Sequence, residues 1–220
     1  MLCGVLVHPN RSEVFPFAPE PIMQADGSKK NDCERNASKR FLNTLKREHP
    51  HLKPVVIEDG LAPNGPHIKL LKSLNYCFIL GAKESDHGFL FDWVEHTKET
   101  RYLEQTDDKG GHRRFRYVNG VPLNNSHFEL EVNFLEVWES TANGKNRHFS
   151  WVTDFLLSDD NLTQIMSAGR ARWKIENETF NTLKTQGYHF EHNFGHGHKH
   201  LSSVFASLML LACLLACFSA

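Results

Sequence analysis

The sequence lacks the signatures of several broad classes of protein. Its five cysteines are odd in number and include no Cys-x2-Cys pair, which excludes a zinc ribbon and a disulfide-stapled miniprotein and is typical of reduced thiols. Neither sign of charge is in excess, because 25 lysines and arginines face 26 aspartates and glutamates, so net charge indicates no partner. No basic region precedes the short amino-terminal apolar run, as it would in a signal peptide. We therefore expect a cytoplasmic globular protein.

Two local concentrations stand out from this ordinary composition. Five of the 14 histidines fall within a short stretch, and the sequence ends in an apolar run from Val204 to Ala220. A membrane span takes about 20 apolar residues, so this run is close to the minimum, and a C-terminal helix buried in a core is the preferred interpretation. We expect no membrane partner. The clustered histidines are His189, His192, His196, His198 and His200.

The first 82 residues alternate between short apolar runs and amphipathic stretches. This alternation predicts an α/β fold with a partly parallel sheet. The predicted elements are strands over 2–7 and 13–17, a helix from Asp32, a buried strand over 54–59, a helix opened by Asn64-Gly65-Pro66, and a buried strand over 76–81.

The apolar pattern changes to a period of two over residues 83–155, as in RFRYV and FELEVNF. Such alternation predicts a β-rich insertion built of hairpins. The predicted organisation is therefore a first part of an α/β core over 1–82, the insertion over 83–155, and a second part of the core over 156–220 that ends in the apolar helix.

The first candidate site lies on a long helix predicted from Asp159-Asp160 to Thr185. At about 100° per residue its apolar positions form one stripe, and Glu176 falls inside that stripe, so its carboxylate is predicted to point into the core. A buried carboxylate costs several kcal/mol unless a cation or a metal ion offsets it. Arg172 lies one turn earlier, so a structural ion pair is an alternative to a metal site.

Asp59 is the second candidate. It ends the predicted strand over 54–59, and open α/β sheets build their sites at the carboxyl ends of such strands. An aspartate followed by glycine is also common in turns, so this position alone does not identify a site. The neighbouring Glu58 should point to the other side of the sheet, because side chains alternate along a strand.

Three segments together resemble the DDE transposases of bacterial insertion sequences, in the branch where a β-rich insertion precedes the catalytic glutamate. They are QADGSKKNDCERNASKR, EDGLAPNGPHI and GRARWKIENETFNTLKTQGYHFEHNFGHG, and the resemblance covers nearly the whole chain. Within the family signature Tyr-x2-Arg-x3-Glu-x6-Lys, Arg172 and Glu176 satisfy the Arg-x3-Glu part.

The resemblance implies a ribonuclease-H-like mixed sheet interrupted by the insertion. It assigns Asp59 and Glu176 to the second and third catalytic, metal-binding carboxylates, with Mg²⁺ or Mn²⁺ as cofactor. In such chemistry two divalent ions about 3.5–4 Å apart assist in-line attack on a phosphodiester. The implied partners are DNA, as transposon ends and target, which Arg172 and Lys184 would contact, and a second copy of the chain in a homodimer.

The sequence departs from the family pattern at three places. Gly169 stands at the tyrosine position, and Leu183 stands at the lysine position, with Lys184 one residue later. Residues 1–17 contain no aspartate that could serve as the first carboxylate of the family. We therefore expect an N-terminally incomplete, truncated transposase that does not cleave DNA by itself.

A histidine-rich metal-binding protein without catalysis is the alternative. His192 and His196 are four residues apart, and imidazole is a good ligand for zinc and other transition metals, so this alternative predicts that His192, His196 and His198 converge on one point. A basic cluster over 109–116 is compatible with phosphate contacts from the insertion and equally with a solvated hairpin face.

Overall fold

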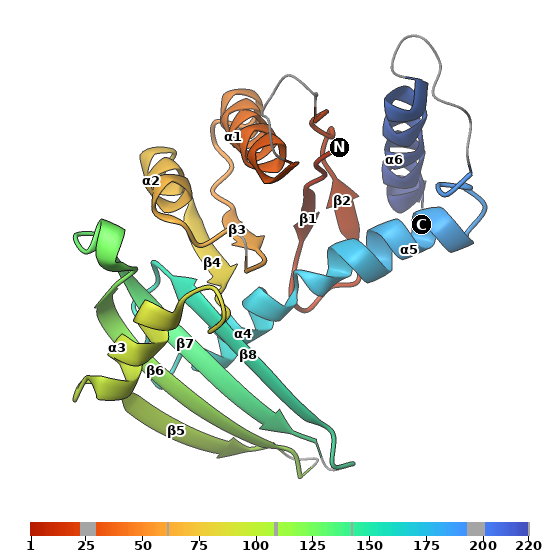
Figure 1. The fold of residues 1–220 in the computed structure, drawn as a ribbon. Helices are drawn as coiled ribbons and strands as arrows, with labels where there is room; N and C mark the ends of the chain where they lie inside the picture. The colour runs from red at the N-terminus through yellow and green to blue at the C-terminus, as the bar shows by residue number, and fades with distance from the viewer. Residues whose placement is uncertain (23–29, 61, 108–109, 142, 193–200, 220) are drawn as a thin grey trace. The chain divides into compact units, whose positions relative to one another are not determined.

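The computed structural model describes residues 1–22, 30–60, 62–107, 110–141, 143–192 and 201–219, with the backbone alone at 30–33 and 217–219. The chain forms two compact units (Figure 1). The sheet unit is Lys53–Arg170, and the terminal unit combines Met1–Leu52 with Ala171–Ala220. The fold is mixed α/β, as the sequence predicts.

The sheet unit is built on six strands in the order β3-β4-β8-β7-β6-β5 (Figure 1). β3 runs parallel to β4, and every other neighbouring pair is antiparallel. The β-rich insertion therefore extends the core sheet, because β8 pairs directly with β4. The strands are β3 Val55–Glu58, β4 Cys77–Gly81, β5 Arg101–Thr106, β6 His112–Pro122, β7 Glu131–Ser140 and β8 Asn146–Thr153.

The helices of this unit follow local signals in the sequence. In α2, Gly65–Ser73, the side chain of Asn64 accepts a hydrogen bond from the His67 N–H at 3.1 Å, and a proline occupies the first turn, where its missing N–H costs nothing. A short 3-10 turn, η2, spans Asn125–His127. The helix α3, Gly88–His96, packs on one face of the sheet through Phe91 and Phe134, whose ring centroids are 5.1 Å apart.

The opposite face of the sheet is covered by α4, Leu162–Arg170. Leu162, Ile165 and Met166 of this helix are buried in one cluster with strand residues that include Phe115 and Leu135. Phe134 and Leu135 are consecutive, so they point to opposite faces of the sheet. Alternate residues along the strands of the insertion thus pack against α3 on one face of the sheet and against α4 on the other.

In its described residues, the terminal unit contains a two-stranded antiparallel hairpin and four helical segments. Its elements are β1 Val5–Val7, β2 Val14–Pro16, α1 Lys30–Glu48, the π-helical η3 Ile175–Phe180, α5 Asn181–Thr185 and α6 Leu201–Ser219. One face of α6 is buried, where Leu210 and Cys213 pack with Leu183. Within the described residues, no helix is both long and apolar enough to cross a membrane.

The single long helix predicted up to Thr185 is wrong. The structure ends α4 at Arg170, turns at residues 171–172, and then continues through the π-helical η3 into α5. A π-helical turn holds more residues than an α-helical turn, so the predicted stripe loses its phase after Gly169. Glu176, predicted to be buried, has a side chain that is 59% exposed.

Two smaller predictions also need correction. The strand predicted over 54–59 is only partly buried, because β3 lies at the end of the sheet and Val55 is exposed. The predicted cap of the helix at Asp159-Asp160 is displaced: Asn161 lies directly before α4, and its side chain accepts a hydrogen bond from the Ser158 N–H at 3.0 Å. Asp159 instead accepts a hydrogen bond from the Tyr117 hydroxyl at 2.7 Å.

Replacement of Gly169 by alanine is expected to destabilise the protein. A Cβ at this position would lie 2.7 Å from the indole of Trp151 and 3.2 Å from Ile79, both of which are buried. Overpacking of a core typically costs about 1–3 kcal/mol, which exceeds the gain of up to about 1 kcal/mol from helix propensity. Urea unfolding of Gly169→Ala should therefore show a lower free energy of unfolding.

The matched control is Gly88→Ala, at the first residue of α3. A Cβ on Gly88 would meet no atom within 4 Å, so its free energy of unfolding should change by less than about 0.5 kcal/mol. Equal stability of both variants would contradict the packing of α4 on Trp151.

Candidate functional site

Asp59 lies where the sequence predicts a site, directly after β3 at the carboxyl ends of the parallel pair β3 and β4. It is exposed, and its carbonyl accepts a hydrogen bond from the Ala62 N–H at 3.0 Å. The Asp59 backbone passes close to the last residue of β4, since a Cβ on Gly81 would lie 3.6 Å from the Asp59 Cα. A Cβ on the next residue, Gly60, would lie 3.3 Å from the side chain of Lys83. The backbone at Asp59 and Gly60 thus lies beside the last residue of β4 and the side-chain carbons of Lys83.

His87 joins this end of the sheet, and no sequence signal identified it. The residue precedes the first residue of α3, and its Nε2 atom is buried without a hydrogen-bond partner among the described residues. Burial lowers the pKa of His87, while a hydrogen bond with the Gly60 backbone and the charge of Asp86 act in the opposite direction. A histidine with a lowered pKa is neutral at pH 7 and adds no positive charge beside Asp59.

Glu58, the residue before Asp59, has a structural partner. Its carboxylate lies 2.5 Å from Nε2 of His67 on α2. The imidazole is largely buried and the carboxylate is partly buried. This contact ties α2 to β3, so the two neighbouring carboxylates differ in role, and only Asp59 is exposed at the end of the sheet.

Glu176 lies in the terminal unit, at the second residue of η3. Its Oε1 accepts a hydrogen bond from Nη1 of Arg172 at 3.0 Å, which is the ion pair that the spacing allowed. Lys184, on α5, forms a similar exposed pair with Glu191 at 2.7 Å. Exposed pairs of this kind contribute less than about 1 kcal/mol, so both cations can exchange partners at little cost.

Lys174, two residues before Glu176, is buried. Its ammonium donates hydrogen bonds to the carbonyl oxygens of His8 at 2.7 Å and Pro9 at 3.2 Å, and to that of Arg11. These carbonyls belong to the turn between β1 and β2. The turn therefore fixes the position of the backbone two residues before Glu176.

Asp59 belongs to the sheet unit and Glu176 to the terminal unit. Among the described residues, no three histidine, cysteine, aspartate or glutamate side chains are grouped so as to hold a metal ion. His196, His198 and His200 lie outside the described residues. His192 is exposed, and its N–H donates to the His189 carbonyl at 2.9 Å in a turn.

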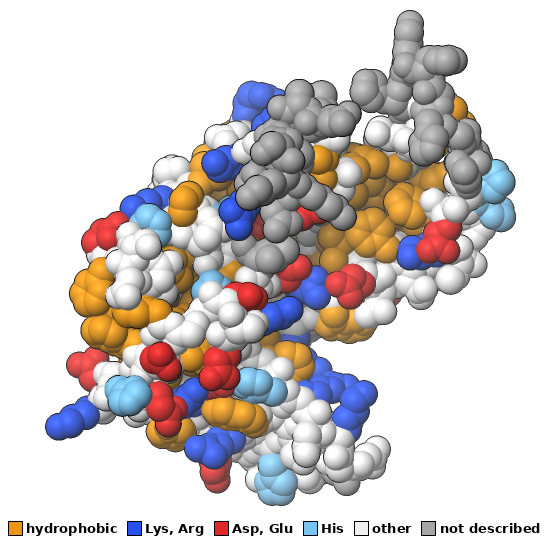
Figure 2. Space-filling model, viewed as in Figure 1, with side chains coloured by type: hydrophobic (Ala, Val, Ile, Leu, Met, Phe, Trp, Pro, Cys, Tyr) orange, Lys and Arg blue, Asp and Glu red, His pale blue; other side chains and the backbone are white. Residues whose placement is uncertain are grey.

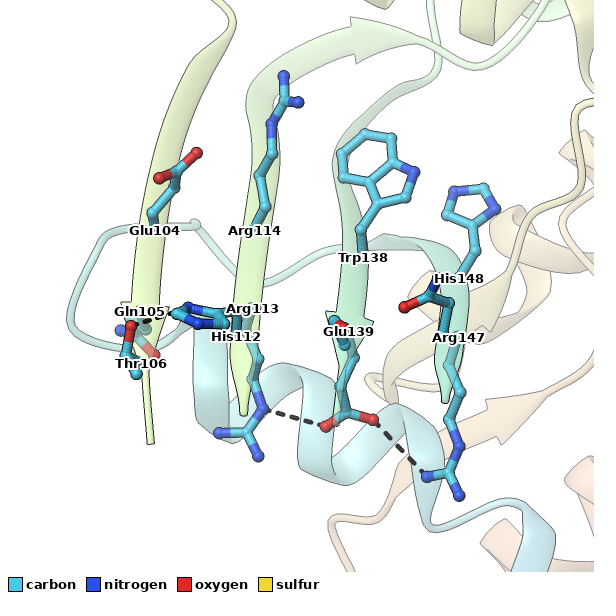
Figure 3. Close-up of a pocket in the computed structure, with 12 residues that line it drawn as sticks. Glu104, Gln105, Thr106, His112, Arg113, Arg114, Trp138, Glu139, Arg147 and His148 are labelled. Carbon is cyan, nitrogen blue, oxygen red and sulfur yellow. Dashed lines mark hydrogen bonds and ion pairs between the residues drawn. The ribbon is translucent and has the colours of Figure 1, made fainter. Parts of the chain in front are cut away.

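A hollow of about 630 Å³ lies at the hairpin ends of strands β5 to β8 (Figure 3). On one face of the sheet the Arg114 guanidinium lies 5.3 Å from the ring centroid of Trp138, and His148 stacks on the same ring at 5.3 Å. On the other face Arg113 and Arg147 point to Glu139 (Figure 3). The basic cluster predicted over 109–116 is thus divided between the two faces, and Lys109 lies outside the described residues.

The chain was compared with models of protein families and with curated proteins. No protein-family model matches the chain, and no curated protein matches it significantly.

The lowered pKa of His87 predicts a pH dependence of stability. The unfolded chain binds a proton with a pKa near 6.5, and the folded protein binds it only at lower pH. Between the pKa of His87 in the folded protein and its pKa in the unfolded chain, the unfolded state holds more protons than the folded state. The free energy of unfolding therefore falls as pH is lowered from 7.5 to 5.5. Chemical unfolding at both pH values should show a smaller fall in His87→Asn than in the unmodified protein.

His96→Asn is the matched control, because His96 is exposed in the last turn of the same helix. The control should keep the full pH dependence. If His87→Asn and the unmodified protein lose equal stability at pH 5.5, then His87 is not buried in its neutral form.

Proposed function

We propose that this protein is a DDE transposase component with a ribonuclease-H-like core, in which Asp59 and Glu176 bind Mg²⁺ or Mn²⁺ and Arg172 and Lys184 contact DNA. The proposal combines the sequence resemblance with the chain order of the described elements. It assigns no target sequence and no terminal repeat.

One observation carries the proposal, namely the order in which the chain builds its elements around the carboxylates. A parallel β3–α2–β4 crossover presents Asp59 at its carboxyl end, where α/β sheets build their sites. The antiparallel strands β5 to β8 follow, and α4 covers that sheet before the chain reaches Glu176. This order is the one that the resemblance implies.

The exposure of both carboxylates supports a metal-binding role. Mg²⁺ prefers oxygen ligands and keeps several of its water molecules, so it is bound by carboxylates that reach solvent. When bound, such ions supply activation of a water or hydroxyl nucleophile and charge stabilisation of the leaving oxygen. Asp59 and Glu176 would provide ligand oxygens, and neither is buried in a way that would prevent it.

The exposed ion pairs supply the proposed DNA contacts. If Glu176 turns to a metal ion, the guanidinium of Arg172 loses its carboxylate and becomes available to a DNA phosphate. Lys184 can exchange Glu191 for a phosphate in the same way. Each exchange replaces one weak surface pair by a charge-assisted contact with the DNA backbone.

The proposal predicts metal binding that depends on both carboxylates. The Asp59→Asn and Glu176→Gln variants should each bind Mn²⁺ at least about tenfold more weakly than the unmodified protein, because each substitution removes a charged oxygen ligand. Free Mn²⁺ measured by electron paramagnetic resonance, with Mg²⁺ as competitor, gives the affinities. Glu178→Gln, two residues after Glu176, and Asp92→Asn on α3 are the matched controls.

Equal weakening by the control variants, or no weakening by Asp59→Asn, would contradict the proposal. A histidine-based metal centre would respond to His192→Ala instead. Incubation with plasmid DNA and Mg²⁺ or Mn²⁺ should give no nicking above background, because the resemblance assigns only the second and third carboxylates of the family to residues of this chain. Metal-dependent cleavage that disappears in Glu176→Gln would show a complete catalytic site.

A further inference from the structure

Glu139 is a buried carboxylate surrounded by three arginines. It lies on β7 with its side chain 7% exposed, on the face of the sheet that α4 covers. Arg113 donates to it from Nε at 3.1 Å, and Arg170 donates from Nη1 to both of its oxygens, at 3.0 and 3.2 Å. Nη1 of Arg147 lies 3.6 Å from Oε2 (Figure 3). We call these four residues the arginine cluster.

The cluster carries more positive charge than its carboxylates balance. Arg113 also pairs with Asp107 at 3.3 Å, so three guanidinium groups face two carboxylates and one positive charge is left over. Arg113 is shared by both carboxylates, so the excess lies at Arg147 and Arg170. Within the described part of the chain, neither of these two arginines has a carboxylate other than Glu139 within 4.0 Å.

Arg170 is held in place, and both arginines reach solvent. The Arg170 guanidinium lies 5.1 Å from the ring centroid of Phe149, which in turn stacks on Trp151 at 5.5 Å. Arg170 also occupies the last turn of α4, where a cation interacts favourably with the helix dipole. The side chains of Arg147 and Arg170 are nevertheless 37% and 27% exposed. A ligand from solvent would thus meet the fixed guanidinium of Arg170 together with that of Arg147, whose Nη1 lies 3.6 Å from Glu139.

We propose that Arg147 and Arg170, oriented by Glu139, form a binding site for a phosphate group, and that the group is a phosphodiester of a nucleic-acid backbone. A guanidinium presents five N–H donors in a planar fork that suits a phosphate, and the contacts with Glu139 use one nitrogen of each arginine. A phosphodiester carries one negative charge, which equals the excess of the cluster. The opposite face of the same hairpin ends carries the stacked Arg114, Trp138 and His148, a combination that binds unpaired bases elsewhere.

This inference does not rest on the proposed function, because all of its residues lie in the sheet unit and none of them is a proposed metal ligand. It is tested with the full chain in EDTA, by fluorescence anisotropy of a labelled 20-nucleotide single strand and of a 20-base-pair duplex over a range of salt concentrations. Inorganic phosphate, titrated alone and as competitor, separates a nucleic-acid backbone from a free phosphate.

The double variant Arg147→Gln/Arg170→Gln should bind the oligonucleotides at least about tenfold more weakly, with the slope of log affinity against log salt reduced by about two. Lys98→Gln is the matched control, since Lys98 is exposed in the same unit and loses one positive charge, and it should weaken binding by less than about twofold. Arg147→Lys keeps the charge without the fork, so it should restore only part of the affinity that Arg147→Gln loses.

Circular dichroism and thermal unfolding test whether each variant is folded. If the double variant does not fold, the same binding measurements are made on Arg147→Gln alone, which changes the more exposed of the two arginines. Binding of inorganic phosphate that depends on both arginines, without oligonucleotide binding, supports the phosphate site and overturns its nucleic-acid source. Oligonucleotide affinity and salt slope that are unchanged in the arginine variants, or equally reduced in Lys98→Gln, would overturn the site. Because binding is measured in EDTA, its outcome is independent of metal binding by the proposed carboxylates, so failure of the carboxylate chemistry is distinguishable from failure of the phosphate site.

Discussion

The pairing of β8 with β4 determines most of the architecture. It joins a parallel β3–β4 pair to four antiparallel strands, with Gly81 opposite Trp151, so that one sheet carries both kinds of strand. The same Trp151 lies against Gly169, which lets α4 approach the sheet closely. Any larger side chain at residue 169 would meet a rigid indole. The tyrosine of the resembled signature therefore has no space here unless Trp151 moves.

Buried cations and carboxylates of this protein are held by specific partners instead of forming a single charged surface. Lys174 is satisfied by three carbonyl oxygens of the β1–β2 turn. Glu136, buried on the other face from Glu139, accepts hydrogen bonds from Arg116 and His148, each at 2.7 Å. The balance of charges in the composition thus conceals a local excess at Arg147 and Arg170, which reaches solvent.

Local sequence patterns predicted much of the fold, because turn residues and apolar periods reflect interactions between residues that are close in the chain. The sequence predicts the strands β1 and β2, the helix α1, the succession of β3, α2 and β4, and strands within the insertion. Glu176 shows where this reasoning stops. The prediction that Glu176 is buried assumed one continuous α-helix, with about 100° of rotation per residue. The turn and the π-helical segment after Arg170 interrupt that helix, so Glu176 points elsewhere. Asp59 needed no such extrapolation, because the end of a strand is a local property.

The sequence by itself determined the α/β class, the alternation within the insertion, the position of Asp59 at a strand end, and the pairing of Arg172 with Glu176 at a spacing of four residues. Only the tertiary structure decided that the insertion continues the core sheet and that His87 lies half-buried near the end of β3. It also decided that Arg113, Arg147 and Arg170 meet at Glu139. The physical reason is range. Hydrogen bonding and side-chain periodicity within one helix or strand act between near neighbours in the chain. The register between strands and the packing of a helix on a sheet bring together distant residues, such as Ile79 and Thr153, which pair although their positions differ by 74.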